Sequence, residues 1–106
     1  MLFRSAYEIV RNSIGYTRAN VKICATHAGI TVGEDGGSHQ AIEDIALMRV
    51  IPGMTVISPS DAVSAEKLIE QTAAIDGPFY IRLGRSGVPV GSQAKFAEAK
   101  IGRAHV

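Results

Sequence analysis

Apolar positions along the chain follow two spacings, one typical of helices and one typical of strands. Ala6, Ile9, Val10 and Ile14 lie three to four residues apart, which predicts an N-terminal helix with one buried face. Three short runs rich in β-branched or aromatic residues predict strands at residues 21–25, 54–58 and 79–83.

Two further helices are predicted between the strands. Ser38 is a candidate N-cap for the first, which Pro52-Gly53 ends. Ser58-Pro59-Ser60-Asp61 offers a cap for the second. The apolar faces are expected at Ile42, Ile45, Ala46 and Val50, and at Val63, Leu68, Ile69 and Ala73.

Alternation of helix and strand predicts an α/β fold. We expect three layers, α/β/α, with a mostly parallel sheet. Right-handed crossovers then place the loops after all three strands at one edge of the sheet. These loops are residues 27–39, 58–61 and 84–87. Ligands of open α/β sheets bind at this edge, so we expect the functional surface there.

Composition narrows the class of protein. The sequence has 106 residues and a formal net charge of +1, so bulk charge favours neither nucleic acid nor a membrane surface as a partner. No apolar run reaches the roughly 20 residues of a membrane span. The single cysteine, Cys24, excludes an intrachain disulfide, and its neighbours indicate a buried strand thiol. These features predict a cytoplasmic protein.

Residues 26–40 form a glycine-rich loop that carries two histidines and two carboxylates. Its glycines let a ligand approach the backbone closely. His27 and His39 can donate hydrogen bonds and exchange protons, and Asp35 can accept from a hydroxyl. Arg85, after the third strand, can hold a phosphate through parallel hydrogen bonds. Together these groups suit a phosphorylated polyol.

Each of these residues also has a simpler interpretation. His27, His39 and Arg85 can be solvated side chains, and Asp35 between glycines can be a turn residue. Asp44, near the start of a helix, is explained by the helix dipole alone. A metal site from the two histidines and Asp35 matches no standard ligand spacing, so no metal ligand is predicted in this chain.

The loop resembles the transketolase family nearly residue for residue. Thr26-His27, Gly33-Glu34-Asp35-Gly36 and Ser38-His39-Gln40 follow the family pattern in order and spacing. Further matches are Arg49, Pro52 and Met54, then Pro59 and Asp61, then Gly77-Pro78 and Leu83-Gly84-Arg85. Gly37 stands where the family usually has proline.

This resemblance implies a thiamine-diphosphate fold and a reaction. Transketolases move a two-carbon ketol unit from a ketose phosphate to an aldose phosphate. The chain resembles their pyrimidine-binding domain, closest to the C-terminal subunit of split transketolases. By this resemblance His27, Asp35 and Arg85 bind substrate, and His39 is the catalytic residue beside the cofactor.

The resemblance also implies what other parts of the enzyme supply. Thiamine diphosphate, with Mg²⁺ or Ca²⁺, is held by a diphosphate-binding domain or an N-terminal subunit in a homodimer or heterotetramer. The activating glutamate of the family lies upstream of the matched region, so we expect the isolated chain to be inactive. A deoxyxylulose-phosphate synthase-like or dehydrogenase-type subunit, or a non-catalytic sugar-phosphate-binding module, remains an alternative.

Domain organisation follows from where the resemblance ends. Residues 1–90 are expected to form a partial pyrimidine-binding domain, truncated relative to the family, and residues 91–99 a linker. Residues 100–106 can be encoded by a common sequencing adapter, so we expect a non-native tail there. An ordinary basic tail is the alternative.

Overall fold

The protein is described here by a computed structural model over residues 3–91. Its order is α1 (Phe3–Ile9), a π-helix η1 (Val10–Gly15), β1 (Lys22–Ala25), a 3₁₀ segment η2 (Ile30–Asp35), α2 (Asp44–Val50), β2 (Thr55–Ile57), α3 (Ala62–Ala74) and β3 (Phe79–Arg82). The expected tail at 100–106, and the linker beyond Gly91, lie outside the described residues.

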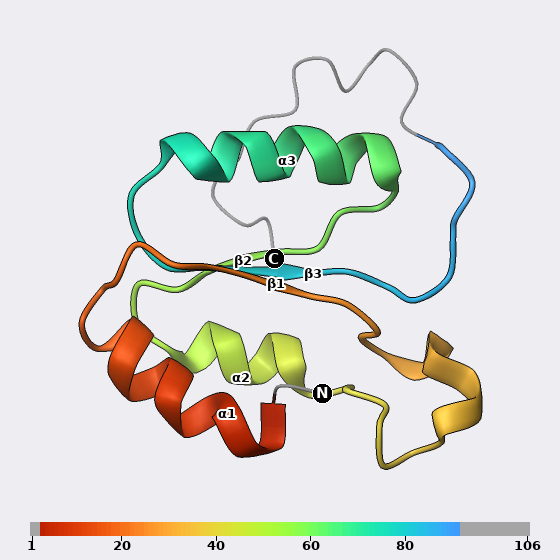
Figure 1. The fold of residues 1–106 in the computed structure, drawn as a ribbon, viewed down its shortest axis with the longest axis horizontal. Helices are drawn as coiled ribbons and strands as arrows, with labels where there is room; N and C mark the ends of the chain where they lie inside the picture. Colours follow the sequence, from red (N-terminus) through yellow and green to blue (C-terminus); the bar gives the residue numbers. More distant parts are fainter. Residues whose placement is uncertain (1–2, 92–106) are drawn as a thin grey trace.

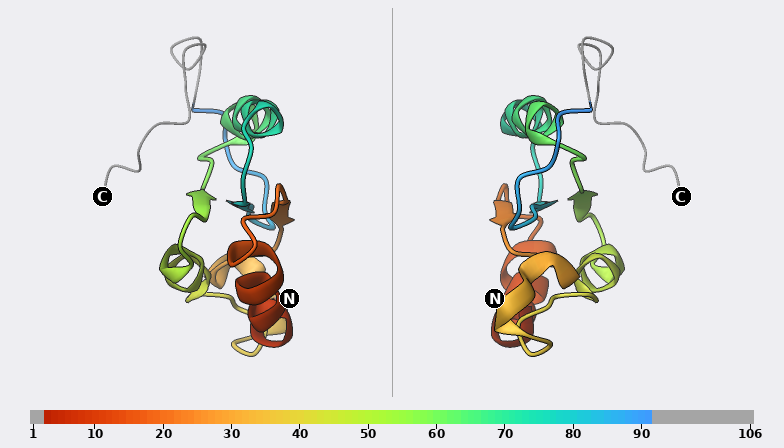
Figure 2. Two further views of the ribbon diagram at one scale, coloured as in Figure 1. Left: turned by 90° about the vertical axis from the view of Figure 1, so that its left-hand side faces the viewer. Right: turned by 90° about the vertical axis from the view of Figure 1, so that its right-hand side faces the viewer.

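The three strands form one parallel sheet in the order β1-β3-β2. Helices α1 and α2 cover one face, and α3 covers the other (Figure 1). The side views in Figure 2 show the same layering, with the sheet between α3 and the helix pair. The predicted three-layer α/β/α fold is therefore confirmed. All three strands lie within the predicted ranges.

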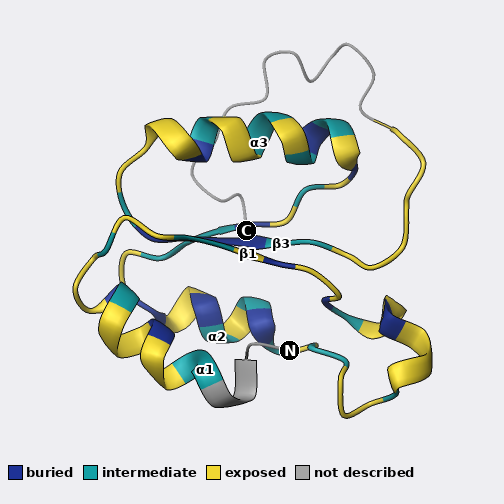
Figure 3. Cartoon of the chain, in the orientation of Figure 1, coloured by how far each residue is buried: buried dark blue, intermediate teal, exposed yellow. Residues whose placement is uncertain are grey.

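The central strand β3 organises the core because both of its faces are covered. Tyr80 points to the α1–α2 side and packs with Val10, Met48 and Ile51. Phe79 and Ile81 alternate to the α3 side and pack with Ile57, Leu68 and Leu83. Figure 3 shows the buried residues concentrated along β3 and the inner faces of the helices. A strand buried on both faces is typical of a parallel sheet.

The first helix differs from its predicted face. Ile9 is 62% exposed, whereas Val10 is buried. The helix changes to π geometry at Val10, so the residues that follow no longer keep the spacing of an α-helix. Gly15 is buried at the end of η1, where an added Cβ would collide with Ile51. The glycine thus allows close packing on α2.

The second helix starts later than predicted, and its face is different. Ser38 is not its N-cap: α2 begins at Asp44, with Glu43 at the cap position and no side-chain capping bond. Residues 38–43 form turns and loop instead. Asp44 and Met48 face the core, while Ile42 and Val50 are exposed. A buried charged residue at a core position explains why a purely apolar pattern selected the wrong face.

The third helix has the predicted cap. Asp61 accepts a hydrogen bond from Ser64 N at 2.9 Å, and Ser64 Oγ accepts one from Asp61 N in a reciprocal capping box. Its buried residues are Ser64 and Thr72, whereas Ala73 and Ile69, expected in the core, are exposed. Cys24 is also exposed, contrary to the prediction of a buried thiol.

Candidate functional site

The loops after the three strands meet at one edge of the sheet, as predicted. Together they line a cleft of about 390 Å³. Ala28 and Thr31 come from the first loop, the segment from Ser58 to Ala62 from the second, and Gly84 and Ser86 from the third. Sequence-distant loops often converge at this edge in α/β binding sites, but His27, Asp35, His39 and Arg85 are not among the residues that line the cleft.

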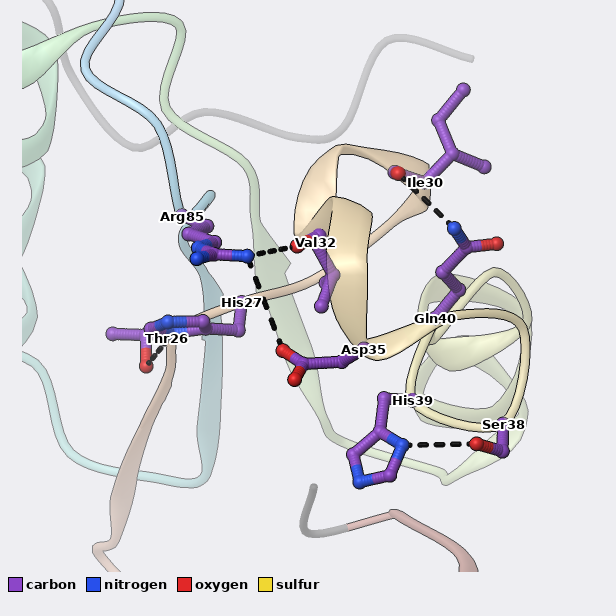
Figure 4. A network of polar contacts seen from close by, with 9 residues as sticks. All are labelled: Thr26, His27, Ile30, Val32, Asp35, Ser38, His39, Gln40 and Arg85. Carbon is purple, nitrogen blue, oxygen red and sulfur yellow. Dashed lines mark hydrogen bonds and ion pairs between the residues drawn. The ribbon is translucent and has the colours of Figure 1, made fainter.

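Arg85 leaves the third loop and reaches across to the glycine-rich loop. Its Nη1 donates a hydrogen bond to the carbonyl oxygen of Val32 and lies 4.0 Å from Asp35 Oδ2 (Figure 4). Both charged side chains are half exposed, so the ion pair itself adds little stability. The remaining guanidinium donors can therefore serve a ligand, while the Val32 carbonyl fixes the position of the side chain.

The backbone of the glycine-rich loop places Asp35 next to Arg85. Its 3₁₀ segment is kinked at Gly33, which has a φ of 75° and lies against the guanidinium of Arg85. Gly36 then ends the segment at a φ of 71°. Glycine is favoured at both positions because side chains rarely adopt such backbone angles.

His27 directly follows β1 and has a left-handed backbone with a φ of 61°. A residue other than glycine in this region costs on the order of 1–3 kcal/mol and is often found at functional sites. The exposed ring is within hydrogen-bonding distance of its neighbour, with Nδ1 3.0 Å from Thr26 Oγ1. His27 therefore stands at the sheet edge with its ring available to a ligand.

His39 lies at the other end of the loop. Its Nδ1 is 3.0 Å from Ser38 Oγ, and its side chain is exposed (Figure 4). Within residues 3–91 no hydrogen bond or ion pair joins either histidine to Asp35 or Arg85. The structure thus brings Asp35 and Arg85 together directly and places the two histidines at the ends of the same loop.

Metal binding finds no support in the described part of the chain. No group of three or more histidine, cysteine, aspartate or glutamate side chains is arranged to hold an ion there. No described helix is long and apolar enough to cross a membrane.

A buried polar cluster beneath the loop was missed by the sequence analysis. Asp44 is completely buried, and its Oδ2 accepts hydrogen bonds from Tyr80 Oη at 2.9 Å and from Arg82 Nε at 2.8 Å. Burial raises the pKa of the Tyr80 phenol, and the hydrogen bond to Asp44 raises it further. The dipole of α2 therefore does not by itself account for an aspartate at this position, because Asp44 is also buried and hydrogen-bonded to the facing strand.

One sequence signal could have revealed this cluster. Tyr80 and Arg82 are two residues apart on a strand, so they share a face of the sheet. That face meets α2, and Asp44 is one helical turn before the buried Met48. Arg82 is partly buried on this face, so a carboxylate on the facing helix is the partner that its charge favours.

Comparison with known proteins identifies what the chain resembles. Residues 2–90 match the family model described as "Transketolase, pyrimidine binding domain". A Methanocaldococcus jannaschii protein named as a transketolase C-terminal section is 56% identical over 80 residues, covering 76% of this chain and 25% of that protein. Human transketolase is 39% identical over 83 residues, covering 78% of this chain and 13% of that protein.

A solved structure agrees with these sequence matches. A split-gene transketolase, described as an inactive β4 tetramer, superposes with a TM-score of 0.76 at 52% identity. The match covers 89% of this chain and 29% of that one. The chain therefore spans about a quarter of the archaeal relative and less of the human one.

Proposed function

The chain belongs to the transketolase family, and we propose that it supplies the substrate-binding face of the pyrimidine-binding domain in a working transferase. The reaction is the transfer of a two-carbon ketol unit from a ketose phosphate to an aldose phosphate. The proposal is supported most directly by Arg85, which is held at the carboxyl edge of the sheet within 4.0 Å of Asp35.

This arrangement suits a phosphorylated sugar for electrostatic reasons. Arg85 can form two parallel hydrogen bonds to a phosphate, which gives both affinity and orientation. Asp35, beside it, can accept a hydrogen bond from a sugar hydroxyl. His27 adds an imidazole at the same sheet edge, where it can donate to the phosphate or to a hydroxyl.

His39 is proposed to serve the cofactor rather than the substrate phosphate. The family relationship supports thiamine diphosphate, which when bound supplies the nucleophilic carbon that takes up and releases the two-carbon unit. The exposed imidazole of His39 fits a role beside the aminopyrimidine, where it can move a proton. The diphosphate and its Mg²⁺ or Ca²⁺ are proposed to be held by another part of the enzyme.

We propose that this other part is a diphosphate-binding domain or a separate N-terminal subunit. Two relatives support this division: a protein named as a C-terminal section and a split-gene transketolase described as an inactive β4 tetramer. The complete assembly is then a homodimer or a heterotetramer in the cytoplasm. The chain alone is expected to show no turnover.

Reconstitution tests the proposed function. The complete coding sequence that carries this domain is expressed with its diphosphate-binding partner and thiamine diphosphate. Turnover is expected with xylulose 5-phosphate and ribose 5-phosphate. Turnover with pyruvate and glyceraldehyde 3-phosphate instead would indicate a deoxyxylulose-phosphate synthase and would contradict the proposal, as would binding of sugar phosphate without any turnover.

A further inference from the structure

Buried Asp44 and Tyr80, with the partly buried Arg82, form a polar cluster against the start of the glycine-rich loop. Asp44 is the first residue of α2, and Arg82 is the last residue of β3. Asp44 Oδ1 is buried and has no hydrogen-bond partner within residues 3–91. The carboxylate is therefore held by the two bonds to its Oδ2, from Tyr80 and Arg82.

Arg82 connects this carboxylate to the loop. A Cβ added at Gly29 would lie 2.9 Å from Arg82 Nη2, so the guanidinium packs directly against the glycine backbone. Gly29 has a φ of 83° and a ψ of −169°, a conformation that glycine alone adopts easily. One end of the guanidinium is thus bonded to Asp44, and the other supports Gly29.

Backbone hydrogen bonds at this position join the start of the loop to the residue after β3 and to the residue after the loop. Ala28 N donates to Leu83 O at 3.2 Å, and Gly29 N donates to Ala41 O at 2.9 Å. Ala28 also forms an isolated parallel bridge with Ala41. The left-handed His27 directly precedes this junction. A strained backbone persists only where the surrounding structure holds it, and the junction provides those contacts.

We propose that Asp44 and Arg82 are positioning residues that fix the start of the glycine-rich loop and thereby hold the His27 imidazole in place for a sugar phosphate. The loop-fixing part stands on the contacts above, and the sugar-phosphate part rests on the proposed function. Arginine is needed because its planar group bonds Asp44 through Nε while Nη2 supports Gly29; lysine has one nitrogen and cannot do both.

Amide hydrogen exchange on the chain tests the loop-fixing part directly. Arg82→Lys and Asp44→Asn are expected to speed exchange at Ala28 and Gly29 by about tenfold, because the junction opens locally. Thr72→Val is the matched control: it removes the hydrogen bond from the buried Thr72 side chain to Ile69 O on α3, away from the loop. Equal acceleration in the control, or unchanged exchange at Ala28 and Gly29, overturns the proposal. Arg82→Lys still decides it if Asp44→Asn does not fold.

Kinetics of the reconstituted enzyme test the link to His27. Arg82→Lys is expected to raise KM for xylulose 5-phosphate by about tenfold, with little change in kcat, because a misplaced group loses binding. In a His27→Ala background, the same change is expected to raise KM no further. Independent, additive effects overturn the link. If the unmodified enzyme is inactive, the proposed function fails, while hydrogen exchange still decides the loop-fixing part.

Discussion

At the scale of single residues, the candidate site depends on backbone angles that few residues tolerate. His27, Gly29 and Gly33 all have positive φ within one short segment. Gly33 was recognisable in the sequence as a position of unusual backbone geometry, but Gly29 was not singled out. The strained backbone of His27 was not, because left-handed geometry in a histidine is imposed by tertiary contacts with no local pattern of their own.

Gly29 offers the sharpest test of this strain. Gly29→Ala is expected to lower the free energy of unfolding by about 1–2 kcal/mol, because the residue keeps a positive φ. Contact of the added methyl group with Arg82 adds to this cost. Gly37→Ala is the control, since nothing lies within 4 Å of an added Cβ and its φ is not positive. Urea unfolding checks both variants; equal stability of the two contradicts the assigned role.

Charged residues were predicted least reliably at this scale. Asp44 was assigned to the helix dipole, but it is buried and paired with Arg82. A pattern analysis treats every aspartate as polar and therefore exposed. The partner of this carboxylate, Arg82, lies on β3 and meets α2 only in the folded chain.

At the scale of elements, the strands were predicted well and the helix faces only in part, since Val10, Ile14 and Leu68 do pack in the core. β1, β2 and β3 fall inside the predicted runs because short β-branched segments have few alternatives. The predicted start of α2 was wrong by five residues, since Ser38 was expected at the cap position that Glu43 occupies. Residues 37–39 form a turn after Gly36, so the helix begins later in the sequence than expected.

One capping residue links helix α3 to the segment that follows the third loop. Asp61 Oδ1 accepts from Ser64 N, and its Oδ2 accepts from Gly91 N at 2.9 Å. This second bond ties the segment that follows Arg85 to the helix. The cap was predictable from its sequence, whereas the bond to Gly91 depends on tertiary structure.

Asp61→Ala is expected to lower the free energy of unfolding by about 1–2 kcal/mol, because the cap of a buried helix end is lost. Asp76→Ala, an exposed carboxylate in the turn before β3, is the control and should have little effect. Thermal unfolding measures both. A smaller loss for Asp61→Ala than for Asp76→Ala is inconsistent with the capping box.

At the scale of the whole molecule, the buried phenol of Tyr80 couples stability to alkaline pH. Its pKa lies above the ordinary value of 10.0 because of burial and the hydrogen bond to Asp44. Above pH 10 the unfolded chain has lost this proton while the folded chain keeps it. Stability from Tyr80 is therefore full below that pH and decreases as the pH rises above it.

Ultraviolet absorbance of phenolate checks this coupling. The chain has three tyrosines, so the Tyr80 signal is read as the difference between the protein and its Tyr80→Phe variant. Tyr80 is expected to ionise only together with the loss of circular dichroism. Tyr80→Phe should remove this alkaline component of unfolding. Ionisation of Tyr80 in a chain that stays folded is the contrary result.

The architecture as a whole was predicted from the order of elements and is confirmed. Parallel strands place their carboxyl ends at one edge, and this alone brings Arg85 close to the glycine-rich loop. The sugar-phosphate role of this edge remains the central proposal. Arg85 is its most direct probe, because it joins two loops and carries the charge that a phosphate needs.

The decisive measurement is KM for xylulose 5-phosphate in the reconstituted enzyme with Arg85→Ala, beside Arg49→Ala as an exposed arginine on α2. Loss of charge-assisted hydrogen bonds predicts that KM rises by roughly ten- to a hundredfold for Arg85→Ala, with little change for Arg49→Ala. An unchanged KM in the Arg85 variant, with the unmodified enzyme active, would show that the phosphate binds elsewhere and would contradict the proposed site.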